Sequence, residues 1–508
     1  MKHRWSLVTC LAVLPACNNT PPAAAPTSAA PASAAPATAA PEAPKSAAAP
    51  ASVTVADAAF KDAAFPAPPT WKGRVFKLSA DFPAEAPACT PETCPWLSVE
   101  VDFGNGTAPD FDKGGWAKYM AAILDYVKAN QDPNLANEVG FRTEVDGQTR
   151  WYNVPWMAFD ARVGREFVHG CTNERSVPLS AIVGAVDPAD NVHRLRSKVA
   201  DKACSVLFES WSVGYYNPQG GWAIGQAIPR TGAQAGVPQA VPGEGGAMNL
   251  KGLPFPDGTL VVKILTTSAP EQCVPALKGA PVWQVDRHTP TPDGDYLCAR
   301  TVQESRILQM DVAVVDARSP MRWVYGTFVY NGEGDGATFW DRLQPLGVQW
   351  GSDGATWPAA QPEDSKPLQQ TSLNPAVTSY EHEGCFGRLA GPVDNAQSSC
   401  MSCHAGAFGA APVGTPGKMG GNIPPIFGFD GLCYQTDPPS TPPPTLTAQQ
   451  LADNKAYFGS RPWPAPYADP KYAGAIPLDT SLQVQVALNQ YAVYQTQNGQ
   501  PRACKDKQ

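Results

Sequence analysis

The pattern of apolar and polar positions predicts a chain built mainly from β-strands. Apolar runs of strand length, several of them alternating, occur at 74–78, 97–103, 259–265, 306–316 and 321–330. The last two are joined by a short connection, which predicts neighbours in an antiparallel sheet. A turn signal, Phe-Pro-Asp-Gly, precedes the strand at 259–265. The expected fold is therefore mainly β with peripheral helices (α+β), with an antiparallel β core.

Helical patterns are fewer. Residues 116–129 place Tyr119, Ile123 and Val127 on one face, which predicts an amphipathic helix. Residues 447–458 and 481–495 also have helical patterns, with Thr447 and either Asp479 or Thr480 as N-caps. The glycine-rich span 220–252 predicts loops.

The first residues have the pattern of an export signal. Lys2 to Arg4 are charged or polar, a short apolar stretch follows, and Leu14-Pro15-Ala16-Cys17 resembles a bacterial lipobox. This predicts a lipoprotein signal peptide over 1–17 with lipid on Cys17; plain secretion is the alternative, since Pro15 stands where a small residue is usual. Asn18 and Asn19 directly follow Cys17, with no aspartate there, which favours the outer membrane, facing the periplasm or the cell surface.

Residues 18–55 predict a disordered tether, because alanine, proline, serine and threonine dominate and recurring prolines exclude a continuous helix. The folded body is expected as a mixed α/β region over 56–250 and a β-rich region over 251–508. The net charge of the 508 residues is −8, and no basic run occurs. Nucleic acid is therefore not an expected partner.

One motif in the β-rich region indicates chemistry. In Cys400-Met401-Ser402-Cys403-His404 the two thiols and the imidazole fall on one face of a helical turn. The thiols can form thioethers with the vinyl groups of a haem, and His404 can ligate its iron. A thiol–disulfide centre or half of a zinc site are the alternatives, but no βαβ unit and no second ligand pair accompany the motif. The motif predicts one covalent haem c in a helical segment of the C-terminal region.

The second axial ligand is left open between four alternatives. Met419, in a glycine-rich stretch, is one candidate and would raise the haem potential. His382 is another and would lower it. The third alternative is a different side chain. The fourth is an iron whose second axial position is open or occupied by water.

The cysteine content fits an oxidising compartment. Of 13 cysteines, Cys10 leaves with the signal, and nine remain after the lipid and haem positions are assigned. Proximity in the sequence suggests three disulfides and leaves three cysteines over. The pairs are Cys89–Cys94, Cys171–Cys204 and Cys273–Cys298, and the cysteines left over are Cys385, Cys433 and Cys504.

The order of features over 253–406 resembles a family of β-sheet c-type cytochromes. The resemblance is carried by the stretches 254–263, 310–316 and 323–330 followed by the haem motif. The family includes hydroxylamine-oxidising enzymes with a lysine cross-linked to haem, and the c′-beta gas-binding cytochromes. The resemblance implies a mostly antiparallel domain whose iron is open on one face, with Lys263 as the candidate for a lysine cross-link.

Three functions follow from these patterns. The default is a membrane-anchored monohaem cytochrome that transfers electrons to or from a redox partner protein, which the sequence does not identify. The first alternative is a five-coordinate haem enzyme or gas-binding protein for a small nitrogen- or oxygen-containing molecule. The second is a binding protein that haem stabilises. Phosphate-binding loops, a nucleophile elbow and zinc-protease motifs are absent from the sequence.

Overall fold

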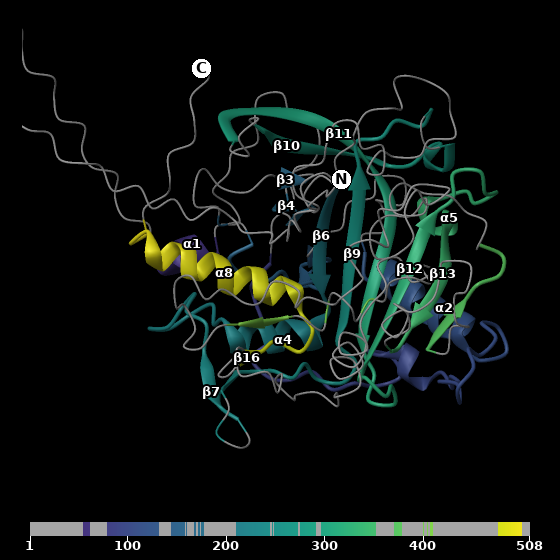
Figure 1. The fold of residues 1–508 in the computed structure, drawn as a ribbon, viewed down its shortest axis with the longest axis horizontal. Coiled ribbons are helices and arrows are strands. Elements are labelled where there is room, and N and C mark those ends of the chain that lie inside the picture. The colour runs from purple at the N-terminus through teal and green to yellow at the C-terminus, as the bar shows by residue number, and fades with distance from the viewer. Residues whose placement is uncertain are drawn as a thin grey trace, which may run out of the picture. The chain divides into compact units, whose positions relative to one another are not determined.

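Ten strands of the described part of the chain pair into one antiparallel sheet (Figure 1). The computed structural model describes residues 54–60, 79–131, 144–157, 159, 167–168, 171–172, 174–176, 210–243, 246, 248–272, 275–290, 296–351, 370–377, 400, 404, 407–409 and 476–499. The strands of the sheet are β3 (Phe167–Val168), β4 (Cys171–Thr172), β5 (Glu174–Ser176), β6 (Ser210–Tyr216), β9 (Leu260–Thr267), β10 (Val282–Pro290), β11 (Tyr296–Val315), β12 (Trp323–Tyr330), β13 (Leu343–Gln349) and β14 (Thr371–Leu373). The expected antiparallel β core is confirmed.

The long strand β11 organises this sheet. Its first half pairs with β10, and its second half lies between β9 and β12. Beyond β12 come β13 and β14, and beyond β9 come β6 and β5. The strands predicted at 259–265, 306–316 and 321–330 are therefore three adjacent strands, and the last two are antiparallel neighbours as expected. Since β6 pairs with β9, residues on both sides of position 250 contribute to one sheet.

Alternate side chains of the central strands enter two separate apolar cores. Leu260, Val262 and Ile264 belong to the first core, whereas Val261 packs against the second. Neighbouring strands divide in the same way, with Val314 and Val324 in the first core and Val315, Trp323 and Tyr325 in the second. This alternation follows from the two-residue repeat of a strand, and it means that the sheet is covered on both faces.

Helix α2 (Trp116–Ala129) covers the first core. Its Met120 packs so closely on Gly326 of β12 that a methyl group at that glycine would meet the methionine sulfur at 2.8 Å. At the start of the helix, Trp116 stacks on Trp350 with 4.7 Å between ring centroids. The amphipathic pattern predicted this helix with its observed bounds.

The predicted strand at 97–103 is wrong. A 3₁₀ helix, η1 (Pro95–Ser98), begins instead, and residues 99–103 are irregular. The carbonyls of this segment accept hydrogen bonds from side chains rather than from a neighbouring strand. Arg318 Nη1 donates to Val99, Trp116 Nε1 to Asp102 and Trp350 Nε1 to Phe103. The alternating pattern arises because every second residue packs on the first core without a strand partner.

The glycine-rich span 220–252 is not simply loops, because it contains most of helix α4 (Pro218–Ala227) and the strand pair β7 (Ala240–Pro242) and β8 (Met248–Leu250). Asn217 caps α4 and Pro218 occupies its first turn. Added methyl groups on Gly220, Gly221 and Gly225 would collide with Tyr216, Tyr152 and Phe82, respectively. These glycines therefore permit close helix packing against aromatic rings.

The C-terminal helix α8 (Leu482–Thr496) confirms the helix predicted at 481–495, but its N-cap is Ser481. The hydroxyl of Ser481 accepts from the amide of Val484, and the predicted caps Asp479 and Thr480 have other roles. The sequence patterns at 74–78 and 447–458 lie outside the described residues, as do the signal peptide, Cys17 and most of the tether. Among the described residues, no helix combines the length and apolar character needed to cross a membrane.

The remaining short elements surround this framework. Helix α1 (Val55–Ala59) packs in the second core, while α5 (Phe339–Arg342) and the 3₁₀ helix η6 (Pro275–Leu277) contribute to the first. Two further strand pairs are β1 (Glu144–Val145) with β2 (Gln148–Thr149), and β15 (Phe408–Gly409) with β16 (Ile476–Pro477).

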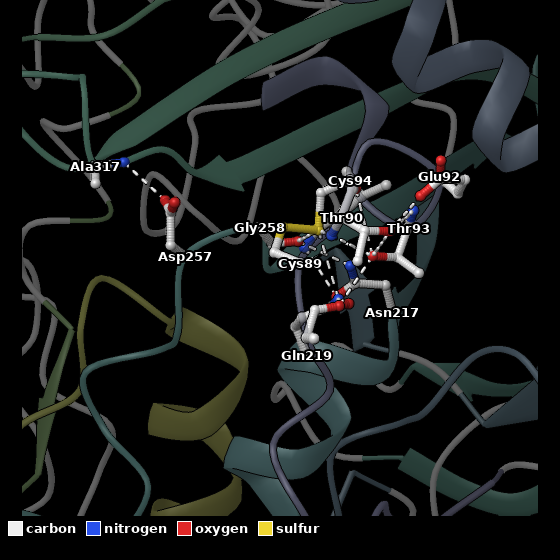
Figure 2. The surroundings of a disulfide bond; sticks show 12 residues. Cys89, Thr90, Glu92, Thr93, Cys94, Asn217, Gln219, Asp257, Gly258 and Ala317 are labelled. Carbon is white, nitrogen blue, oxygen red and sulfur yellow. Dashed lines mark hydrogen bonds between the residues drawn. A yellow bond between two sulfur atoms is a disulfide. The ribbon is translucent and has the colours of Figure 1, made fainter. Parts of the chain in front are cut away.

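The predicted disulfide between Cys89 and Cys94 is confirmed (Figure 2). Cys94 is buried while Cys89 is exposed, and both sulfur atoms lie against Gly258 in the turn before β9. Gln219 Nε2, at the start of α4, lies 3.5 Å from the Cys94 sulfur. The bond thus fixes the exposed 89–94 loop beside the end of the sheet. The predicted pairs Cys171–Cys204 and Cys273–Cys298, and the three cysteines left over, have side chains outside the described residues.

Candidate functional site

His404, the expected iron ligand, lies on the second core against strand β12. Its ring is 4.8 Å from the ring of Tyr325, centroid to centroid. Nδ1 of His404 is 2.9 Å from the backbone oxygen of Thr480, which stands just before α8. The histidine is therefore held between the sheet and a segment 76 residues further along the chain.

This contact fixes which ring nitrogen carries the proton. A carbonyl oxygen can only accept a hydrogen bond, so Nδ1 must be the donor. In the neutral ring the lone pair then belongs to Nε2, the nitrogen available to a metal. Metal-binding histidines commonly donate their other ring nitrogen to a carboxylate or a backbone carbonyl in this way.

The surroundings also favour the neutral ring. Burial and, to a smaller extent, the positive charge of Lys263 lower the pKa of His404 to about 4, although the hydrogen bond to Thr480 opposes the change. At neutral pH the imidazole is therefore uncharged, which is the form that ligates metals. The residue as a whole is half-buried.

Cys400, four residues before His404, is anchored at the adjacent strand. Its amide donates to Oε1 of Gln349 at 2.6 Å, and Nε2 of Gln349 donates to Thr371 Oγ1 at 2.9 Å. Gln349 is the register partner of Tyr325, so the two anchors of the motif meet the sheet side by side. Both Cys400 and His404 have helical backbone. A four-residue spacing is the one that places two side chains on one face of a helix.

Two backbone hydrogen bonds connect the residues just after the motif. Ala407 donates its amide to the carbonyl of His404 at 3.1 Å, and Leu478 donates to the carbonyl of Ala407 at 3.2 Å. Strand β15 then pairs with β16. The residues after the histidine are thus joined directly to the segment that leads to Thr480.

A row of polar side chains lies on the same face of the sheet as Tyr325. Lys263, Asp311 and Thr327 are register partners on β9, β11 and β12, two residues along from the row that contains Tyr325. Thr327 Oγ1 and Gln309 Nε2 both donate to Oδ1 of Asp311 at 2.9 Å. We call these four side chains the polar row.

The electrostatics of the polar row connect it to the histidine. Burial raises the pKa of Asp311 to about 6, while the hydrogen bond from Thr327, the charge of Lys263 and the hydrogen bond from Gln309 oppose the rise. Lys263 thus acts on both Asp311 and His404. Carboxyls with a perturbed pKa are common at functional sites.

The structure describes only some of the expected site residues. Cys400 and His404 are among the described residues, whereas Cys403, Met419 and His382 lie outside them. The sequence analysis did not single out Tyr325, Asp311 or Thr480 as parts of the site. Asp311 could have been noticed, because it is a lone charge inside an apolar strand run. Nothing in the sequence indicates that Tyr325 and Thr480 contact His404.

Comparison of the chain with family models, with curated proteins and with solved structures finds no match. Among the described residues, no group of three or more histidine, cysteine, aspartate or glutamate side chains is arranged to hold a metal ion. The candidate site therefore stands on the geometry of Cys400, His404 and their supports.

Proposed function

We propose that this protein is an exported, membrane-anchored monohaem c-type cytochrome that transfers electrons. The observation that carries the proposal is the state of His404. Its Nδ1 is committed to the Thr480 carbonyl and its ring is neutral at pH 7, so Nε2 has a lone pair available to iron. This histidine stands four residues after Cys400 and one after Cys403, the order that covalent haem attachment requires.

Different residues of the chain would hold different parts of the haem. Cys400 and Cys403 would bind haem c through thioethers, and His404 would ligate its iron. Tyr325 packs against the imidazole, and the Thr480 carbonyl fixes its rotation. When bound, the haem supplies one-electron exchange at a potential that its ligands and their hydrogen bonds adjust. The likeness of residues 253–406 to β-sheet cytochromes, and the helical haem segment, belong to this proposal.

The N-terminal sequence supports a place at a membrane surface. Lipid on Cys17 would anchor the chain, and the tether at 18–55 would separate the folded part from the lipid. At about 3.1 Å per residue for proline-rich chain, its 38 residues span on the order of 100 Å when extended. Such a reach suits exchange with a redox partner protein that is not itself held at the same point.

A five-coordinate haem enzyme or gas-binding protein is the second candidate. The polar row favours it, because a simple electron carrier does not need a half-buried carboxyl with a raised pKa and a lysine on the sheet face that also carries the histidine contact. In that case the substrate would be a small nitrogen- or oxygen-containing molecule, and Lys263 is the candidate for a bond to haem that the family resemblance implies.

The test is maturation of the full chain in cells that carry a cytochrome c maturation system. We expect one haem per chain that survives denaturation and extraction, in the wild type and in the control Cys385→Ser. Cys400→Ser combined with Cys403→Ser should lose it. A wild-type protein without covalent haem refutes the proposal and returns the motif to a thiol-redox or metal role.

The spectrum of the matured protein separates the two candidates. A low-spin spectrum that carbon monoxide leaves unchanged means two strong protein ligands and favours electron transfer; Met419→Ala and His382→Ala then identify the second ligand. A high-spin iron that binds carbon monoxide favours the enzyme or gas-binding function.

A further inference from the structure

The segment that supports His404 has an unusual backbone. Asp479 and Thr480 both have positive φ, +45° and +62°. Left-handed backbone is uncommon outside glycine, and for a β-branched residue such as threonine it is a clear outlier. Conformations of this kind persist only where surrounding contacts determine them, and they concentrate at functional sites.

The contacts that determine this backbone converge on the Asp479 carboxylate, which is fully buried. Oδ2 accepts from the Phe255 amide at 2.7 Å. Oδ1 accepts from Trp323 Nε1 at 3.0 Å and from Arg322 Nη1 at 3.4 Å. Arg322 also donates Nη2 to the Phe255 carbonyl at 2.9 Å, which closes the group. One side chain thus ties the segment to the turn before β9 and to the start of β12.

The two residues after Asp479 are tied to the sheet as well. Tyr325 donates its hydroxyl to Thr480 Oγ1 at 2.9 Å, and the hydroxyls of Tyr216 and Ser481 are 2.9 Å apart. Tyr325 therefore contacts His404 with its ring and holds Thr480 with its hydroxyl. The carbonyl of Thr480 is fixed relative to the same strand against which the imidazole packs.

Helix capping does not explain this arrangement. Ser481 supplies the N-cap of α8 by itself, accepting from the Val484 amide. The Asp479 carboxylate has no hydrogen bond to the first turn among the contacts that the structure describes for it. Its contacts instead fix the peptide whose oxygen accepts the hydrogen bond from His404 Nδ1.

We propose that Asp479 is a positioning residue for His404. Its carboxylate holds Asp479 and Thr480 in the backbone conformation that directs the Thr480 carbonyl at Nδ1, and through that hydrogen bond it sets the reduction potential of the iron that His404 ligates. This inference rests on the proposed haem function. A hydrogen bond from Nδ1 makes a ligating imidazole more basic, which stabilises the oxidised iron and lowers the potential.

The test is Asp479→Asn in the matured full-length protein. The replacement keeps the size of the side chain but turns one accepting oxygen into a donor that faces donors, so one anchor is lost. The matched control is Asp316→Asn. Asp316 is equally buried, and its carboxylate accepts hydrogen bonds from Arg318 and Tyr119. Tyr119 belongs to the first core, whereas His404 packs on the second.

We expect Asp479→Asn to raise the potential, measured by spectroelectrochemistry, by an amount that favours the reduced form about tenfold. For a one-electron couple this equals about 59 mV. Asp316→Asn should change the ratio of reduced to oxidised protein at a given potential less than threefold. Covalent haem content and the far-ultraviolet circular dichroism of each variant establish that folded holoproteins are compared.

If Asp479→Asn does not yield folded holoprotein, Tyr325→Phe provides the test, because it removes the hydroxyl that holds Thr480 and keeps the ring against His404. Its potential should rise in the same direction by a smaller amount. An unchanged potential in a folded Asp479→Asn holoprotein, or an equal rise in Asp316→Asn, overturns the inference while leaving the haem proposal intact. A wild-type protein without covalent haem overturns both.

Discussion

Replacing Asp311 by asparagine tests the polar row directly, because the two side chains have the same shape and differ in charge. Both hydrogen bonds to Asp311, from Thr327 and from Gln309, end on Oδ1. An asparagine oxygen at that position can accept both. The substitution should therefore remove the buried charge and leave the hydrogen bonds in place.

The size of the effect follows from the pKa. Burial raises the pKa of Asp311 to about 6, against an ordinary value near 3.9. A raised carboxyl pKa means that the folded protein holds its proton more firmly than the unfolded chain, so stability is lost as the pH rises from about 4 to 6. One pKa unit corresponds to about 1.36 kcal/mol, so the ionised Asp311 costs at most about 3 kcal/mol at pH 7.5.

Asp311→Asn should therefore raise the free energy of unfolding by about 1–3 kcal/mol at pH 7.5 and by less than about 0.5 kcal/mol at pH 4. Urea unfolding followed by tryptophan fluorescence measures both values. His404 is present in both proteins, so its own titration cancels in the difference. Asp125→Asn, at an exposed position on α2, is the control and should stay within about 0.5 kcal/mol at either pH.

Two results would show that this reasoning is wrong. An equal gain at both pH values would mean that the charge of Asp311 is not what costs stability. A loss at pH 7.5 would mean that the attraction to Lys263 outweighs the cost of burial. Combining Asp311→Asn with Lys263→Gln in a double-mutant cycle measures that attraction. A confirmed gain would identify a carboxylate that reduces stability on the sheet face that also carries Tyr325, the residue against which His404 packs, and this favours a chemical role for it.

Three further substitutions test the framework, each by urea unfolding. Cys89→Ser with Cys94→Ser should cost about 2 kcal/mol, the entropy of closing a loop of this size, and should remove the part of the stability loss in dithiothreitol that comes from reducing this bond. Gly258→Ala should cost about 2–4 kcal/mol, because φ is +79° and the new methyl group would collide with both sulfur atoms; a smaller cost after reduction would verify the cause. Thr338→Ala should cost about 1 kcal/mol by removing the capping box of α5, and no change would mean that the box is not formed in solution.

The sequence predicted the parts of the fold in which local pattern and packing agree. The strands at 259–265 and 321–330 are mostly apolar, and the helix at 116–129 has one apolar face, so the local pattern was sufficient in each case. The segment at 97–103 alternates as a strand would, yet its carbonyls accept from Trp116, Trp350 and Arg318. Those donors lie as much as 247 residues away, and no local pattern records them.

Glycine misled the prediction at 220–252 for a similar reason. Glycine lowers helix propensity, so a span rich in it predicts loops. In α4 the same glycines remove side chains that would strike Tyr152, Tyr216 and Phe82, and burial of those rings outweighs the propensity cost of about 1 kcal/mol per glycine. The function of a glycine is visible only when its neighbours in space are known.

The candidate site shows the same division between what is local and what is not. The order of Cys400, Cys403 and His404 is a local pattern, and it alone predicts the haem. The neutral state of His404 depends on its burial. Which nitrogen it offers depends on Thr480, whose carbonyl is directed by contacts of Asp479 with Phe255 and the start of β12. Since the motif is anchored at Gln349 and its histidine at Thr480, the separation of these anchors is fixed by the sheet between β13 and β9. Lengthening the motif by one residue would break this match even if both thiols and the imidazole were retained, because the helical turn would then rotate His404 by about 100° relative to Cys400. The motif must therefore match anchor positions that the sheet fixes, which would give a large β domain a role in the proposed cytochrome.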